Sequence, residues 1–176
     1  SIAAGKHVLI EKPPAMSLGE VHQMIAASRQ AGVRAGVVLQ CRTRKSIQAM
    51  RKAIGEGRFG KLLHADVYMK WFRPAEYYRL AEWRGQRRSG SGVTIAQAFH
   101  YIDLLQYLAG PVKRVEARMN NLAHPGVDVE DTLLAFTEFE NGAQGVVQAS
   151  TALWPGSDIR IEVNGENGAA IMSGDR

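Results

Sequence analysis

The sequence predicts an α+β protein in which a βαβ unit precedes an open-faced, mostly antiparallel sheet with helices on one face. Near the N-terminus, short continuous apolar runs flank a helical pattern, which is typical of parallel strands covered on both faces. After Gly60, the strands alternate apolar with polar residues, which is typical of antiparallel strands with one face in water. We therefore expect a mixed sheet built mainly from residues that follow Gly60.

The N-terminal part predicts a strand, a helix and a second strand. The apolar run Val8-Leu9-Ile10 predicts a buried strand, and Pro13-Pro14 ends it because prolines cannot continue a ladder. Ser17 and Glu20 have the spacing of a capping box, which predicts the start of a helix. Residues 34–40 predict the second strand, so the three elements form a βαβ unit with a right-handed crossover.

The remaining sequence predicts helices and strands around one irregular segment. The expected elements are a helix at 46–54, a strand at 62–71, an irregular aromatic and basic segment at 71–92, a helix at 93–108, and strands at 112–119, 132–139, 143–151 and 159–163. The 93–108 helix is strongly amphipathic, with an expected apolar side of Ile95, Phe99, Ile102 and Leu105. We place a domain boundary near Arg44, which divides the chain into residues 1–44 and 45–176.

Composition excludes several classes of protein. Apolar residues make up 45% of the 176 residues and charged residues 22%, which indicates a folded, soluble domain. No apolar run reaches ~20 residues, and no signal-peptide pattern opens the chain, so we expect a cytoplasmic protein without a membrane partner. Cys41 is the only cysteine, which excludes an internal disulfide. The basic stretch at 29–61 has one aromatic residue and no nucleic-acid-binding module, which favours a solvated face or a surface near an anionic ligand over nucleic acid.

The first candidate site is Glu11-Lys12-Pro13, at the end of the first strand. Ligands of open α/β sheets bind in the crevice beyond the carboxyl ends of parallel strands. A lysine in that position can present its ammonium group to a hydroxyl or carbonyl oxygen, and burial readily lowers its pKa. From position alone, the pattern favours a surface lysine before a turn over a functional one.

The second candidate site is the irregular segment at 71–92. It carries Arg73, Tyr77, Tyr78, Trp83 and Arg84. Aromatic rings can cover the C–H faces of a polyhydroxylated ligand, and guanidinium and phenol groups can bind its oxygens. The alternative is a loop whose aromatic residues only pack against the protein.

The third candidate site is one side of the 93–108 helix, which begins after Gly90-Ser91-Gly92. Ala96, His100, Asp103 and Tyr107 are spaced so that they lie along one stripe of this helix. His100 is either a general acid/base or a histidine with a structural role. The spacing of His100 and Asp103 is poor for a metal site, so we expect no metal.

These motifs occur in one order along the chain. They are Glu11-Lys12-Pro13, then Trp71-Phe72-Arg73-Pro74 with Tyr77-Tyr78, Trp83-Arg84-Gly85, a glycine-rich turn, and Gln97, His100 and Asp103-Leu104-Leu105. In this order, over essentially the whole chain, they resemble the glucose–fructose oxidoreductase/inositol dehydrogenase family. The resemblance implies hydride transfer between NAD or NADP and a sugar or polyol. It also implies an N-terminal Rossmann domain and a C-terminal α/β domain whose open sheet face forms a homo-oligomer.

The resemblance also implies roles for individual residues. Lys12 would be the catalytic lysine that touches substrate and nicotinamide, behind a cis Lys12–Pro13 bond, and His100 would be the acid/base. The implied cofactor-binding residues are Glu11, Lys12, Pro13 and Gln40. The implied substrate-binding residues are Arg73, Tyr77, Tyr78, Trp83, Arg84, Gln97 and Asp103.

Two features depart from the family pattern. The glycine-rich phosphate loop of a Rossmann domain is absent, so we expect residues 1–44 to be the C-terminal remnant of that domain in a fragment that is inactive alone. Ala96 stands where the family often has Asp or Asn. The alternatives are therefore an NAD-dependent glycoside hydrolase on the same scaffold and a non-catalytic sugar-binding relative.

Overall fold

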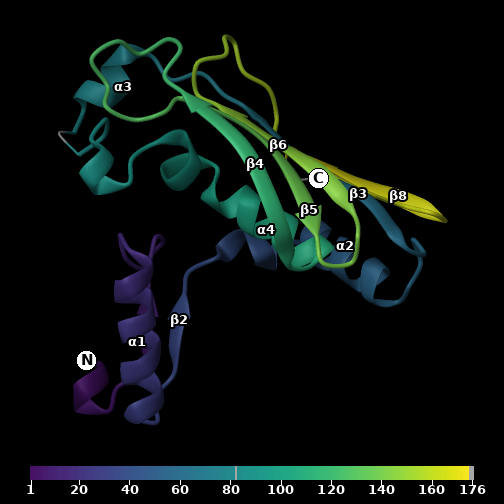
Figure 1. Ribbon diagram of the computed structural model, residues 1–176, viewed down its shortest axis with the longest axis horizontal. Helices are drawn as coiled ribbons and strands as arrows, with labels where there is room; N and C mark the ends of the chain where they lie inside the picture. Colours follow the sequence, from purple (N-terminus) through teal and green to yellow (C-terminus); the bar gives the residue numbers. More distant parts are fainter. Residues whose placement is uncertain (82, 175–176) are drawn as a thin grey trace.

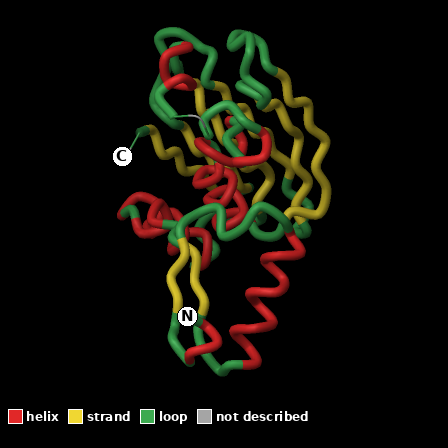
Figure 2. Tube along the Cα trace, turned by 90° about the vertical axis from the view of Figure 1, so that its left-hand side faces the viewer, coloured by secondary structure: helices red, strands yellow, loops and turns green. Residues whose placement is uncertain are grey.

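The computed structural model of the protein describes residues 1–81 and 83–174 and contains two sheets. The small sheet pairs β1 (Val8–Ile10) with β2 (Ala35–Val37) in parallel, and α1 (Leu18–Gln30) connects the two strands. Figures 1 and 2 show α1 and this small sheet extending away from the large sheet. The predicted βαβ unit is therefore present.

The N-terminal unit differs from the sequence expectation in two details. The strand predicted at 34–40 ends at Val37, and a 3₁₀ helix at Gln40–Thr43 follows it. Leu9 is 75% exposed, so the prediction of a buried strand is wrong for this residue. A single helix cannot cover both faces of a two-stranded sheet. The capping box is confirmed, because the amide of Glu20 donates to Ser17 Oγ at 3.2 Å and the amide of Ser17 donates to the Glu20 carboxylate at 3.1 Å.

The large sheet has six strands in the order β4-β5-β6-β3-β7-β8. Its strands are β3 (Leu62–Lys70), β4 (Val112–Asn120), β5 (Thr132–Phe139), β6 (Gln144–Ser150), β7 (Arg160–Gly165) and β8 (Gly168–Ser173). Only β3 and β6 pair in parallel, whereas the other neighbours are antiparallel. The mostly antiparallel mixed sheet predicted after Gly60 is confirmed.

Helices cover one face of this sheet (Figure 1). They are α2 (Lys45–Gly55) and α4 (Phe99–Ala109), and a short helix, α3 (Ala75–Arg79), lies in the aromatic segment. Alternate residues of the strands, such as Val67, Val147 and Ile161, pack beneath the helices with Leu104 and Leu108. Each such side chain contributes roughly 1.5–3 kcal/mol when it is fully buried.

The helix predicted at 93–108 consists of two parts. Val93–Gln97 is a π-helical turn, closed by a hydrogen bond from the amide of Ala98 to the carbonyl of Val93, and α4 follows it. A π turn holds more residues than an α turn, so it shifts the phase of the residues on either side of it. Of the predicted apolar side, Leu105 is buried and Ile102 packs partly buried against the core, whereas Ile95 and Phe99 lie outside the core and are only half-buried. The core face consists of Tyr101, Leu104, Leu105 and Leu108.

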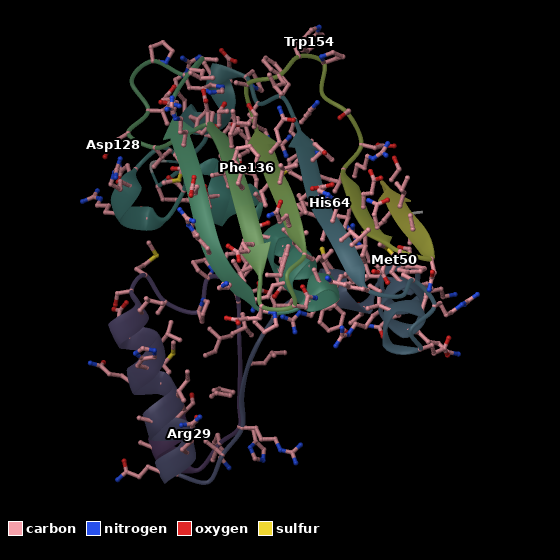
Figure 3. All side chains as sticks on the ribbon, turned by 45° about the vertical axis from the view of Figure 1, so that its right-hand side comes forward. Arg29, Met50, His64, Asp128, Phe136 and Trp154 are labelled. Carbon is pink, nitrogen blue, oxygen red and sulfur yellow. The ribbon has the colours of Figure 1, made fainter. Side chains whose placement is uncertain are left out.

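The opposite face of the large sheet has no covering helix within the described residues. Phe136 is 71% exposed and Leu134 is 51% exposed there, whereas the neighbouring Leu133 is buried. Phe136 lies opposite Val146 in the register, and Figure 3 shows Phe136 and His64 on this face. Val147, by contrast, belongs to the core. Within residues 1–81 and 83–174, no helix is both long and apolar enough to cross a membrane.

Candidate active site

The predicted stripe on the 93–107 segment faces the N-terminal part of the chain. Its first contact joins the first and the third candidate site. Lys12 Nζ donates a 2.8 Å hydrogen bond to the carbonyl oxygen of Ala96. Lys12 is the second residue after β1, and its bond to Pro13 is cis, as the family resemblance implies. Burial lowers the pKa of Lys12, and the nearby Glu11 and Cys41 only partly oppose this effect. The ammonium group is therefore held against the π-helical turn at Val93–Gln97, with an increased tendency to release a proton.

The second contact of the stripe is between His100 and Gln40. Their Nε2 atoms lie 3.4 Å apart, at the end of the segment that follows β2. Burial lowers the pKa of His100, and the positive charge of Lys12 lowers it further. The imidazole is thus kept neutral near pH 7, and its buried Nδ1 has no hydrogen-bond partner among the described residues. A neutral imidazole beside a lysine ammonium can accept a proton from a hydroxyl group.

The third and fourth contacts fix the orientation of α4. Asp103 accepts hydrogen bonds from Arg42 Nε at 2.7 Å and from Arg42 Nη2 at 2.5 Å, an arrangement that occupies both carboxylate oxygens. Gln48 Nε2 lies 3.4 Å from the hydroxyl of Tyr107, whose ring also lies under the Arg42 guanidinium. Asp103 was expected to bind substrate, but in this structure its carboxylate is engaged by Arg42.

A second group of the predicted residues surrounds Tyr77. The guanidinium carbons of Arg73 and Arg84 lie 5.1 and 4.4 Å from the centroid of its ring. Gln97 Nε2 donates a 3.1 Å hydrogen bond to the Tyr77 hydroxyl. Trp83 is half-exposed, and its ring lies 5.4 Å from the Arg84 guanidinium carbon. The structure thus brings Arg73, Tyr77, Trp83, Arg84 and Gln97 into one cluster.

The Tyr78 ring packs edge-on against Tyr77, with the ring centroids 5.2 Å apart, but the Tyr78 hydroxyl does not join this cluster. Its side chain is buried, its hydroxyl lies 2.8 Å from Thr151 Oγ1, and its ring packs against His124. Burial raises the pKa of this hydroxyl. Tyr78 is therefore placed to pack beneath the segment that carries Arg73.

Sequence reasoning missed a buried pair that supports the same segment. His124 Nδ1 lies 2.8 Å from Asp131 Oδ2, and His124 Nε2 lies 2.7 Å from the carbonyl oxygen of Arg73. The amides of Leu122 and Ala123 also donate to the Asp131 carboxylate. Both ring nitrogens of His124 thus face acceptor oxygens, which fixes the orientation of the ring. A loop histidine seven residues before an aspartate has no distinctive spacing, so the pattern alone could not identify the pair.

The described residues fit part of a dinucleotide site. Lys12 and Gln40 follow two adjacent parallel strands at their carboxyl ends, where α/β sheets bind nucleotides, and both contact the 96–100 segment. Glu11 is exposed beside Lys12, and Pro13 is half-buried. These groups can hold a nicotinamide ring but not the pyrophosphate, because the sequence has no glycine-rich loop for it. In the described part of the chain, no group of three or more potential metal ligands comes together.

Comparison with known families identifies both parts of the chain. Residues 47–171 match the GFO/IDH/MocA C-terminal domain. The chain belongs to the GFO/IDH/MocA family. Residues 1–39 match an oxidoreductase family with an NAD-binding Rossmann fold. The resemblance that the motifs indicate is therefore confirmed.

Individual relatives of this family match nearly the whole chain. The WlbA dehydrogenase from Bordetella pertussis, solved in complex with NADH and UDP-GlcNAcA, is 38% identical with a TM-score of 0.93, over 99% of this chain and 53% of that one. A 1,5-anhydro-D-fructose reductase from Ensifer adhaerens is 33% identical over 97% of this chain and 51% of its own length. A scyllo-inositol 2-dehydrogenase (NAD(+)) from Bacillus subtilis covers 96% of this chain and 48% of its own length, at 30% identity. The chain thus spans about half the length of the curated relatives it matches.

Proposed function

We propose that the complete protein transfers a hydride between a sugar or polyol carbon and NAD or NADP, and that this chain supplies the substrate-binding half. The observation that carries the proposal is the meeting of Lys12 with the 96–100 segment, which puts a lysine ammonium of lowered pKa near a neutral His100. Family membership and the relatives named above, two dehydrogenases and a reductase, support it.

The proposed mechanism assigns one task to each residue. NAD(P), when bound, would supply the acceptor for the hydride of the substrate carbon. The ammonium group of Lys12 stabilises the negative charge that develops on the substrate oxygen, and His100 accepts the proton of the hydroxyl group. Gln40 and Lys12 orient the nicotinamide, with Glu11 and Pro13 beside them. Arg73, Tyr77, Trp83, Arg84 and Gln97 hold the rest of the sugar.

One observation favours a second candidate, a sugar-binding relative without catalysis. Ala96 offers only its carbonyl oxygen, which Lys12 already binds, and it has no side chain that could polarise His100. The glycoside hydrolase alternative has no such support, because none of the relatives named above is a glycosidase. The two remaining candidates differ in one respect, since only the dehydrogenase produces reduced nicotinamide.

The organisation of the complete protein forms part of the proposal. We place the domain boundary near Arg44, between the NAD-binding part and the substrate-binding part. Leu134 and Phe136 on the open sheet face form a surface through which two copies would pair. We also propose a cytoplasmic location, which agrees with the single cysteine.

The test screens the complete protein against sugars and polyols, once with NAD⁺ and once with NADP⁺. Turnover is measured as the absorbance of the reduced cofactor. We expect turnover of at least one polyhydroxylated substrate, and Lys12→Met should lower kcat by about 10²–10⁴-fold. The exposed Lys6→Met is the matched control and should leave kcat unchanged. Tight sugar binding with no cofactor reduction would establish the non-catalytic candidate instead.

A further inference from the structure

Two guanidinium groups share one aromatic ring in the candidate site. Arg73 and Arg84 both lie within cation–π distance of Tyr77, at 5.1 and 4.4 Å from its ring centroid. Among the described residues, no carboxylate forms an ion pair with either guanidinium. Two like charges held at one ring repel each other, and an anion bound between them would remove that repulsion.

The polar atoms around the same ring are incompletely satisfied. Arg73 Nε, Arg84 Nε and Gln97 Oε1 are buried and have no hydrogen-bond partner among the described residues. Gln97 is only 8% exposed, and its other amide atom contacts the Tyr77 hydroxyl. Buried polar groups in folded proteins are normally paired, so these three atoms around one ring need partners that the described residues do not supply.

Backbone hydrogen bonds hold Arg73, which follows β3, in a fixed position. The amide of Arg73 donates to the carbonyl of Thr151 at 2.7 Å, and its own carbonyl accepts from His124. Arg84 Nη1 donates to the carbonyl of Tyr77 at 3.3 Å. Nearby carboxylates are already engaged, because Glu130 accepts from the amide of Thr94 and Asp131 accepts from His124. The arginines are therefore positioned in advance without being neutralised by these acids.

The arginine pair lies next to the proposed reaction centre. Lys12 binds the carbonyl of Ala96, and the adjacent Gln97 binds Tyr77. A sugar that places one carbon beside Lys12 and His100 would thus extend its far end toward Arg73 and Arg84. Carboxylate and phosphate groups match the planar fork of a guanidinium, whereas a neutral hydroxyl group does not.

We propose that Arg73 and Arg84 bind an anionic group, a carboxylate or a phosphate, on the sugar substrate. The inference rests on the proposed function, and it narrows the substrate class from neutral polyols to acidic or phosphorylated sugars. Arg73, Arg84 and Gln97 are then the residues that determine specificity for charge.

The test compares D-glucose, D-glucuronate and D-glucose 6-phosphate, which share one ring and differ in charge. Binding to the complete protein in the presence of NAD⁺ is measured by calorimetry and by the fluorescence of Trp71 and Trp83, which lie beside Arg73 and Arg84. We expect at least one of the two anionic sugars to bind about tenfold more tightly than glucose. Preference for glucuronate assigns the group as a carboxylate, and preference for the phosphate ester assigns it as a phosphate.

Substitution of the two arginines tests whether they bind the charge of the sugar or only pack against the protein. Arg73→Gln and Arg84→Gln should each reduce the affinity for the preferred anion by about tenfold, and should reduce the affinity for glucose much less. Arg79→Gln is the matched control, since Arg79 lies between them in the sequence but is exposed and paired with Glu76. Equal affinity for all three sugars, binding of none of them, or an equal loss for glucose and the anion in both variants would overturn the inference.

The outcome for this inference is distinguishable from the outcome for the proposed function. If glucose and glucuronate are oxidised equally well, the dehydrogenase stands and the anion site is rejected. If the anion binds through the arginines but no cofactor is reduced, the anion site stands and the dehydrogenase is rejected.

Discussion

Arg42 holds both carboxylate oxygens of Asp103, with N–O distances of 2.7 and 2.5 Å. The pair connects the 3₁₀ helix that follows β2 to the middle of α4, and it therefore couples the N-terminal unit to the helix that carries His100. A residue expected to contact substrate thus has a partner within the chain.

We expect Arg42→Ala to lower the free energy of unfolding by about 1–2 kcal/mol, because the pair is partly buried and Asp103 would lose its partner. The urea midpoint of the complete protein measures the change. Arg79→Ala removes an exposed arginine from an ion pair with Glu76 and should cost less than about 0.5 kcal/mol. Equal effects of the two substitutions would contradict a structural role for Arg42.

The pH dependence of kcat/KM should be bell-shaped. His100 must be neutral to accept a proton, so activity should rise as the pH increases through its lowered pKa. Lys12 must be charged to stabilise the oxyanion, so activity should fall as the pH increases through its lowered pKa. Both limbs should therefore lie below the ordinary pKa values of these residues.

Substitution should identify the group behind each limb of the profile. His100→Gln should abolish the acidic limb, and Lys12→Arg should move the alkaline limb upward because guanidinium has a much higher pKa. His22→Gln, an exposed histidine on α1, serves as the control and should leave the profile unchanged. A persistent acidic limb in His100→Gln would assign the titration to another group.

Asp131 should make stability depend on pH in the acid range. Burial alone would raise its pKa, but hydrogen bonds from the amides of Leu122 and Ala123 and from His124 outweigh burial and lower it. A folded pKa below the unfolded value stabilises the protein above the unfolded pKa, and this contribution is lost as the pH falls through the folded pKa. Acid unfolding followed by circular dichroism would detect the loss.

Asp131→Asn should cost about 1–3 kcal/mol near pH 7, because an amide cannot accept all the hydrogen bonds that the buried carboxylate accepts from His124 and from the amides of Leu122 and Ala123. It should also flatten the acid dependence of stability. The matched control is Asp128→Asn in the same loop, where the side chain is exposed (Figure 3). A similar loss of stability in both variants would show that the loop, and not the pair, is responsible.

The open sheet face should mediate self-association. Phe136→Lys introduces a charge at the most exposed large apolar side chain of this face and should convert a dimer into a monomer. Light scattering of the complete protein measures the mass before and after the change. Leu122→Lys, at an exposed leucine outside the sheet, should leave the mass unchanged. A monomer before any substitution would refute self-association at this face.

Local sequence patterns were sufficient to predict most of the helices and strands. The capping box at Ser17, the strands predicted at 132–139 and 143–151, and the alternation of Ile159, Ile161 and Val163 each depend on neighbours close in sequence. The stripe from Ala96 to Tyr107 was also predictable, although the π turn at Val93–Gln97 was not, because its i to i+5 bond leaves no distinct periodicity over a single turn.

The sequence by itself determined the βαβ order, the switch to an alternating sheet, and the family motifs that contain Lys12 and His100. Only the tertiary structure decided which of these residues meet. It pairs Asp103 with Arg42, buries Tyr78 against Thr151, and gathers Arg73 and Arg84 at Tyr77. The reason is physical: periodicity reports which side of an element is apolar, whereas polar contacts between residues distant in the sequence depend on how the elements pack.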